Sequence, residues 1–147
     1  MTWQQLQQLG RVRLHQTSKQ ELDDLRAVVE RDLQDATIEA VSDDRRFATA
    51  YNAALQTSKI VIACSGYRVS GIAHHQTSFQ AIELAMGNQV ATYSAFFEAC
   101  RRKRNNVDYD MSGIATRTEV DELIEETTAF VELAEKWIEQ NYPGFKK

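Results

Sequence analysis

The sequence predicts an all-α fold, a helical bundle with four to five main helices. The 147 residues include six Gly and one Pro, and that Pro143 stands near the C-terminal end, so the interior is almost free of residues that interrupt helices. Apolar residues also recur at three- and four-residue steps over long stretches, which is typical of amphipathic helices. This length supports one core and is too short for two ordinary domains. We therefore expect a single domain over residues 1–147, with its bundle between about residues 18 and 140.

The first long helix is predicted to begin after Ser18. An apolar stripe at helical spacing carries it for about six turns, and Ser18 with Glu21 has the spacing of a capping box. The stripe consists of Leu22, Leu25, Val29, Leu33, Ala36 and Ala40. Residues 1–17 contain Trp3, Leu6 and Leu9, and they form either a short docking helix or an arm.

A second helix is predicted to begin after Ser42 and to run to about Ser65. Its Ala-rich middle, residues 48–54, allows a neighbouring helix to approach closely, and Gly66 is a natural stop. Residues 67–76 contain Gly71 and a histidine pair and break the helical period, so we interpret them as the longest internal loop. A short helix is expected to follow, from about Thr77 to Met86.

Two more helices complete the predicted bundle. The first carries Tyr93, Phe96, Phe97, Cys100 and Val107, so that a run of basic residues falls on its C-terminal half. The last starts at the capping box Thr116–Glu119 and is amphipathic and strongly acidic. Cys64 and Cys100 lack metal-ligand spacing, which favours two core residues and no metal site. Tyr51, Tyr93 and Trp137 fall on apolar faces and are interpreted as core or dimer contacts.

The basic run gives the strongest functional signal. Arg101, Arg102, Lys103 and Arg104 are consecutive in a chain with a net charge of −4, and the rest of the chain carries −8. Such a local cluster indicates a site for an anion, such as phosphate or the RNA backbone. Alternatively, the cations interact with the helix dipole and the acidic last helix, and the Asn and Asp residues that follow only end the helix.

Other function classes are excluded by composition. No apolar segment is long enough to span a membrane, and the first residues lack the features of a signal peptide. We therefore expect a soluble cytoplasmic protein that needs no cofactor.

Three segments, taken in order, resemble the HEPN superfamily of prokaryotic toxin, defence and nucleotidyltransferase-associated domains. They are the Ala-rich stretch 46–55, the segment 66–75 with its histidine pair, and the basic run with the residues after it, 101–110. The resemblance implies an up-and-down bundle that forms homodimers, with a polar cleft at the dimer interface.

The resemblance also assigns roles to single residues. Active HEPN ribonucleases have an Arg, four to six residues and then a His, and they cleave RNA without metal. Counting from Arg104 places Tyr109 at the His position, and a tyrosine with a pKa of roughly 10 is a poor base near neutrality. The resemblance thus implies Arg104, Tyr109 and Asp108 as catalytic candidates. The candidates for binding nucleic acid or nucleotide are Arg101, Arg102, Lys103, Asn105, Arg68, His74 and His75.

A second match to the motif spacing is Arg68 with His74, which lies in the predicted loop. His74 and His75 either fold back toward Arg104 and supply the missing imidazole, or help to cap the following helix. Three functional hypotheses follow. The first is a HEPN domain that binds RNA or nucleotide within a toxin–antitoxin or defence module, with or without ribonuclease activity. The second is a catalytically silent HEPN domain that binds a nucleotide or a protein partner, such as a nucleotidyltransferase or an antitoxin. The third is a structural dimer whose polar cleft only fixes the association.

Overall fold

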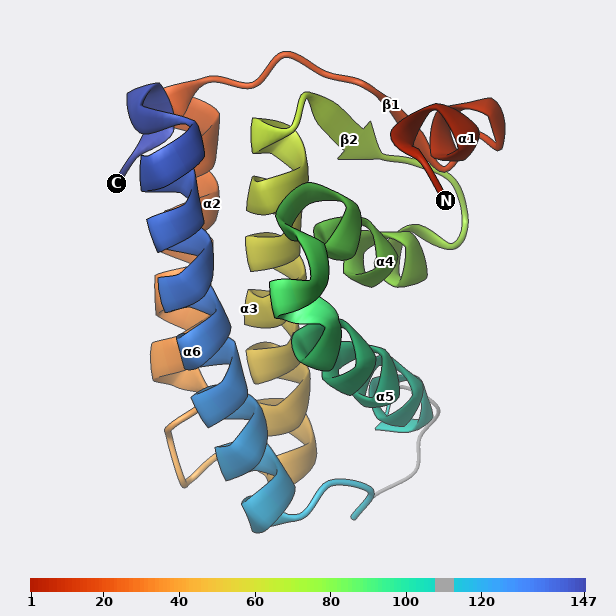
Figure 1. Ribbon diagram of the computed structural model, residues 1–147. Coiled ribbons are helices and arrows are strands. Elements are labelled where there is room, and N and C mark those ends of the chain that lie inside the picture. Colours follow the sequence, from red (N-terminus) through yellow and green to blue (C-terminus); the bar gives the residue numbers. More distant parts are fainter. Residues whose placement is uncertain (108–112) are drawn as a thin grey trace.

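The computed structural model describes residues 1–107 and 113–147. Most of these residues are helical, and the predicted all-α bundle is confirmed (Figure 1). No helix in the described ranges is long and apolar enough to cross a membrane. In chain order the elements are α1 (Trp3–Gln8), β1 (Val12–Leu14), α2 (Lys19–Asp35), α3 (Asp43–Cys64), β2 (Tyr67–Val69), α4 (His74–Met86), the 3-10 helix η1 (Gly87–Val90), α5 (Ala91–Val107), α6 (Arg117–Asn141) and the 3-10 helix η2 (Pro143–Phe145).

Helix α3 is the centre of the bundle. Helices α2 and α6 pack on one side of it, and α4 and α5 pack on the other (Figure 1). Of its 22 residues, 14 are buried. Ala50, Ala53 and Ala54 have no exposed surface, so the neighbouring helices approach its backbone closely, as the Ala-rich stretch predicted.

Aromatic side chains join α4, α5 and α6. The ring of Phe97 lies 5.6 Å from that of Phe79 and 5.3 Å from that of Phe130. Cys64 and Cys100 are free and buried, as predicted, and burial raises the pKa of the two thiols to about 11 and about 12. These cysteines are packing residues with little thiolate at neutral pH.

The N-terminal segment docks against the bundle. Leu6 and Val12 are buried and pack with Ile62 and Ala81. The indole of Trp3 stacks on Tyr67 with 4.5 Å between ring centroids. Of the two predicted alternatives for residues 1–17, the docking helix is therefore the one observed.

The predicted loop over residues 67–76 is confirmed for residues 70–73 and was wrong for the rest of that range. Residues 67–69 form β2, which pairs with β1 in antiparallel register, with Arg13 opposite Arg68. Gly66, with φ of +92°, turns the chain out of α3 into this strand. The partner strand lies far away in the sequence, so no local pattern revealed the pairing.

Helix α4 also begins earlier than predicted, at His74 instead of Thr77. Its N-cap residue is Ala73, which makes no side-chain cap hydrogen bond. The capping role predicted for His74 or His75 was therefore wrong, since both lie within the first turn. Without a polar cap residue, this start gave no sequence signal.

The start and end of α2 differ in detail from the prediction. Ser18 caps the helix and accepts a hydrogen bond from the Glu21 amide at 3.1 Å. The Glu21 carboxylate, however, accepts from Thr17 and contacts His15 and so does not complete the capping box. The helix ends at Asp35 instead of near Ala40. Just beyond Asp35, the Thr37 hydroxyl donates a hydrogen bond to the Gln34 carbonyl and so competes with further helical hydrogen bonding.

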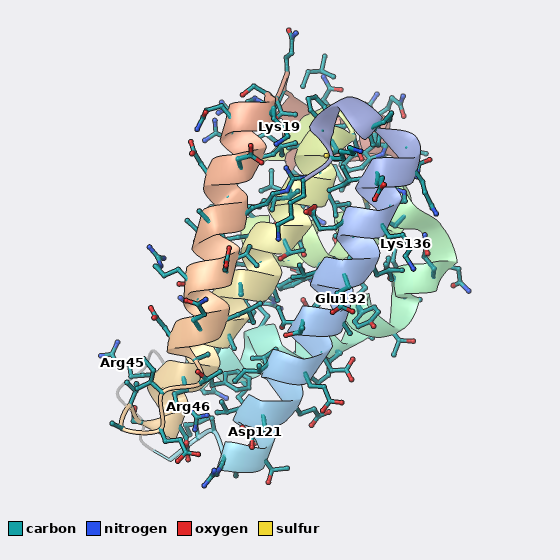
Figure 2. All side chains as sticks on the ribbon, turned by 90° about the vertical axis from the view of Figure 1, so that its left-hand side faces the viewer. Lys19, Arg45, Arg46, Asp121, Glu132 and Lys136 are labelled. Carbon is teal, nitrogen blue, oxygen red and sulfur yellow. The ribbon has the colours of Figure 1, made fainter. Side chains whose placement is uncertain are left out.

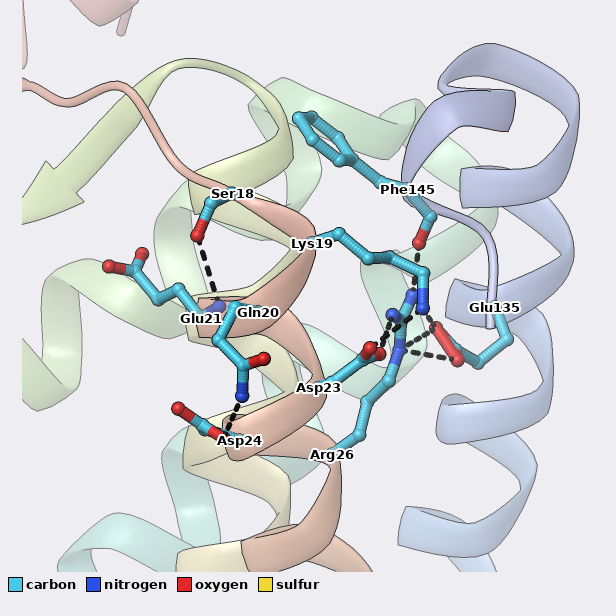
Figure 3. Close-up of polar contacts among 9 residues, drawn as sticks. All are labelled: Ser18, Lys19, Gln20, Glu21, Asp23, Asp24, Arg26, Glu135 and Phe145. Atoms are coloured by element: carbon cyan, nitrogen blue, oxygen red, sulfur yellow. Dashed lines mark hydrogen bonds and ion pairs between the residues drawn. The ribbon is translucent and has the colours of Figure 1, made fainter.

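Two buried arginines fasten α2, α3 and α6 together. Arg26 of α2 donates to Glu135 of α6, to Asp23 and to the Phe145 carbonyl (Figure 3). At the other end of the bundle, Arg46 of α3 donates to the Ala36 carbonyl at 2.7 Å and lies 3.7 Å from the carboxylate of Asp121 on α6 (Figure 2).

Replacing Arg26 should therefore destabilise the domain. We expect Arg26→Ala to lower the free energy of unfolding by about 3 kcal/mol, because it leaves the half-buried Glu135 carboxylate and the Phe145 carbonyl without a donor. Lys19→Ala is the matched control, since Lys19 forms only an exposed pair with Asp23, and it should cost less than about 0.5 kcal/mol. Urea denaturation measures both, and equal effects would contradict the assigned role of Arg26.

Candidate functional site

The four consecutive cations of α5 have different surroundings. Arg101 forms a two-pronged pair with Glu98 at 2.6–3.1 Å, and Lys103 pairs with Glu119 of the acidic helix α6. The side chain of Arg102 is 74% exposed. The Arg104 guanidinium lies over the ring of Tyr51, 5.6 Å from its centroid. A structural ion pair with α6 thus accounts for Lys103 but not for the whole run.

The first turn of α4 holds the two histidines. Their rings stand edge to face with 4.5 Å between centroids. The Nδ1 atom of His75 lies 3.0 Å from the Tyr51 hydroxyl, which projects from α3. His74 Nδ1 lies 3.3 Å from the Gly71 carbonyl. Tyr51 therefore contacts a histidine and an arginine from two different helices.

These groups surround one cleft, which we name the α4–α5 cleft. It has a volume of about 240 Å³ and is open on one side. Helix α5 contributes Arg101, Arg104 and Asn105, and the residues around the start of α4 contribute the opposite wall. That wall consists of Ile72, Ala73, His74, His75 and Gln76. Of the two alternatives for His74 and His75, the structure shows the one in which the histidine pair lies close to Arg104.

The cleft combines permanent positive charge with an uncharged imidazole. Burial, with electrostatic contributions of His74 and Arg104 adding to it, lowers the pKa of His75 to about 4. Burial also raises the pKa of the Tyr51 hydroxyl, so that it keeps its proton. If Tyr51 donates to Nδ1, the other ring nitrogen Nε2 carries the proton and can donate to an anion. If Tyr51 accepts from Nδ1–H, Nε2 is free to accept a proton.

The other predicted residues lie elsewhere. Arg68 is on β2 and borders a neighbouring cavity, which shares His74 with the cleft. Arg102 and Lys103 do not line the cleft. Asp108 and Tyr109 fall outside the described residues.

Sequence reasoning missed three contributors. Gln76 lines the cleft, Glu98 holds Arg101, and the hydroxyl of Tyr51 holds His75. Tyr51 was correctly assigned to the core, with 1% of its surface exposed. The available signal was a tyrosine instead of a phenylalanine on a buried face, because a buried phenolic hydroxyl requires a partner.

No cluster of three or more His, Cys, Asp or Glu residues suited to a metal ion exists within residues 1–107 and 113–147. The polar groups that line the cleft are guanidinium, imidazole and amide groups, and the phenol of Tyr51 contacts one of the imidazoles.

Comparison with protein-family models gives one match, to a HEPN family, over residues 37–135. The match covers more than half of the chain. The chain belongs to the HEPN superfamily. No curated protein and no solved structure gives a significant match. The matched part of the HEPN domain includes α3, α4 and α5 complete, and with them every residue that lines the α4–α5 cleft.

The low pKa of His75 makes the stability of the HEPN domain depend on pH. Below about pH 6.5 the unfolded chain binds a proton at this ring, whereas the folded chain does so only near pH 4. The unfolded state binds more protons in this window, so the free energy of unfolding falls as pH decreases through it. Between pH 7 and 4.5 we expect wild type to lose on the order of 1–2 kcal/mol more than His75→Asn.

Urea denaturation at the two pH values measures this difference, and His74→Asn serves as the control that keeps the His75–Tyr51 contact. Direct titration of the His75 ring by NMR checks the cause. A His75 pKa near 6.5 would contradict the assigned burial.

Proposed function

We propose that this HEPN domain is a cytoplasmic protein that binds RNA or a nucleotide through the α4–α5 cleft. The observation that carries the proposal is the convergence of Arg101, Arg104 and Asn105 with His74 and His75 around one cleft. Guanidinium groups match phosphate oxygens in geometry and charge. Asn and neutral His add hydrogen bonds that suit phosphate or ribose oxygens.

Ribonuclease activity is the extension of this proposal. In the proposed reaction, the neutral His75 ring accepts the proton of a ribose 2′-hydroxyl, whose oxygen forms a bond to the adjacent phosphorus. The bond from phosphorus to the 5′-oxygen breaks, and the proton passes to that oxygen. Arg104 stabilises the charge that develops on the phosphorane.

Binding is better supported than cleavage. Tyr109 stands where the family motif has His, and a pKa of about 4 makes His75 a weak base. Within the HEPN superfamily, the same cleft also fits a silent member of a toxin–antitoxin or defence module, with an antitoxin or a nucleotidyltransferase as its protein partner.

The decisive experiment compares Arg104→Ala with Arg102→Ala on a labelled single-stranded RNA in EDTA. Both variants remove one positive charge from α5, but Arg104 lines the cleft and Arg102 does not. We expect Arg104→Ala to weaken binding at least about tenfold and to lower the slope of log affinity against log salt by about 0.7, the value for one phosphate contact on a single strand. Arg102→Ala should change binding by less than about threefold.

The same samples test cleavage. RNA cleavage in EDTA that is lost in His75→Ala and Arg104→Ala, and retained in Tyr109→Phe, would assign the imidazole as the base. Binding without cleavage would leave a silent binding domain. Equal effects of Arg104→Ala and Arg102→Ala would contradict a site in the cleft.

We also propose that the domain forms a homodimer across the cleft. The supporting observation is Ile72, a cleft-lining residue whose side chain is fully exposed, with 104% relative accessibility. A second subunit that covered this side chain would remove its apolar surface from water, which favours association.

Analytical ultracentrifugation of Ile72→Glu tests the dimer. We expect this variant to weaken dimerisation at least about tenfold. Val41→Glu, which alters an exposed apolar residue in the connection between α2 and α3, should leave dimerisation unchanged. A wild-type monomer at high concentration would contradict the dimer.

A further inference from the structure

A second cavity lies beside the α4–α5 cleft, between α2, α3, β2 and the start of α4. We name it the Lys59 pocket. Its volume is about 470 Å³, which lies within the range of small-molecule sites. Its polar lining consists of His15, Glu21, Gln56, Lys59, Arg68 and His74. His74 alone also lines the cleft, so the two cavities are neighbours with separate walls.

Positive charge prevails in this pocket. The side chains of Lys59 and Arg68 form no hydrogen bond or ion pair with any other residue in the described part of the chain. The acidic lining residue is Glu21, and its carboxylate is already engaged by His15 at 2.7 Å and by Thr17 at 2.9 Å. Glu21 projects from the side of α2 opposite Arg26 (Figure 3). It acts on Arg68 only through the longer-range electrostatic attraction.

The charge on Lys59 is held at an energetic cost. Burial lowers the pKa of Lys59, and the nearby positive charge of Arg68 lowers it further. An anion placed between the two side chains relieves both effects, since it supplies the missing counter-charge and hydrogen-bond acceptors.

The remaining lining is apolar. Leu25, Ile62, Ala63 and Val69 provide aliphatic surface, and Tyr67 provides an aromatic ring. That ring is held in place from behind by its stack with Trp3 of α1, so the docked N-terminal helix stabilises one wall. A ligand that fills the pocket therefore needs an apolar body as well as an anionic head.

We propose that the Lys59 pocket binds a small organic anion, with its carboxylate or phosphate head between Lys59 and Arg68 and an apolar body against Ile62, Val69 and Tyr67. This site lies beyond the proposed RNA- or nucleotide-binding cleft and does not depend on it. The volume and the apolar wall favour a single small molecule over a polymer backbone.

The test uses four probe molecules that distinguish the contribution of the anionic head group from that of the apolar body. Phenyl phosphate and benzoate carry an anionic head on an aromatic body, inorganic phosphate is the head alone, and benzyl alcohol is a neutral body of similar size. Binding is followed by NMR through the backbone amides of Ala63 and Val69 in the pocket and of Gln76 and Asn105 in the cleft. We expect saturable shifts at the pocket amides with phenyl phosphate or benzoate, and weaker binding of the other two probes. The tighter of the two anions identifies the head group.

Variants assign the binding to the two cations. Lys59→Met removes the charge, keeps an unbranched side chain only one atom shorter, and should weaken binding of the better anion at least about tenfold. Lys136→Met changes an exposed lysine of α6 (Figure 2) and should have no effect. Arg68→Gln provides a second variant on an exposed residue, which carries little risk to folding.

Three results would overturn the proposal. They are equal binding by wild type and Lys59→Met, equal binding of benzyl alcohol and the anions, and shifts confined to the cleft amides. Because the NMR shifts report on the pocket and the cleft separately, failure of anion binding in the Lys59 pocket is distinguishable from failure of RNA binding in the cleft.

Discussion

The burial of α3 on nearly all sides is the constraint on which the rest of the structure depends. A helix surrounded by four others needs small residues for close packing and can carry few polar groups. The polar side chains that α3 does carry are therefore placed at points of contact. Arg46 fastens the N-terminal end of α3, Tyr51 contacts His75 of α4, and Lys59 lines the second cavity. The central helix thus takes part in both proposed sites, since Tyr51 holds His75 of the cleft and Lys59 lines the second cavity.

Charge has two separate roles in this domain. Arg26 and Arg46 are buried and saturated by carboxylates and carbonyl groups, so they hold helices together. The basic run of α5 is different because successive residues on a helix point about 100° apart. A dense cluster in sequence therefore becomes a dispersed set in space. Lys103 joins the structural pairs and Arg102 faces solvent. Arg101 and Arg104 reach the cleft.

The candidate site was predictable only in part. The basic run drew attention to residues 101–104 because four consecutive cations are unusual in an acidic chain, and the resemblance to the HEPN motif selected Arg104 among them. The histidine pair was noticed, but its distance from Arg104 depends on how α4 packs against α5, which neither segment encodes alone. Gln76 and Glu98 are ordinary helical residues by pattern, so nothing marked them. The Lys59 pocket combines residues from five segments, including a strand that sequence periodicity assigned to a loop.

By itself, the sequence determined the all-α class, the central Ala-rich helix, the caps at Ser18 and Thr116 and most of the buried faces. These features depend on neighbours within a few turns, so local patterning is sufficient to specify them. Tertiary structure alone decided the β1–β2 pairing, the start of α4 at His74 and the meeting of His75 with Tyr51 and Arg104. Each of these joins residues far apart in the chain, and its free energy comes from packing and burial that exist only once the bundle has formed.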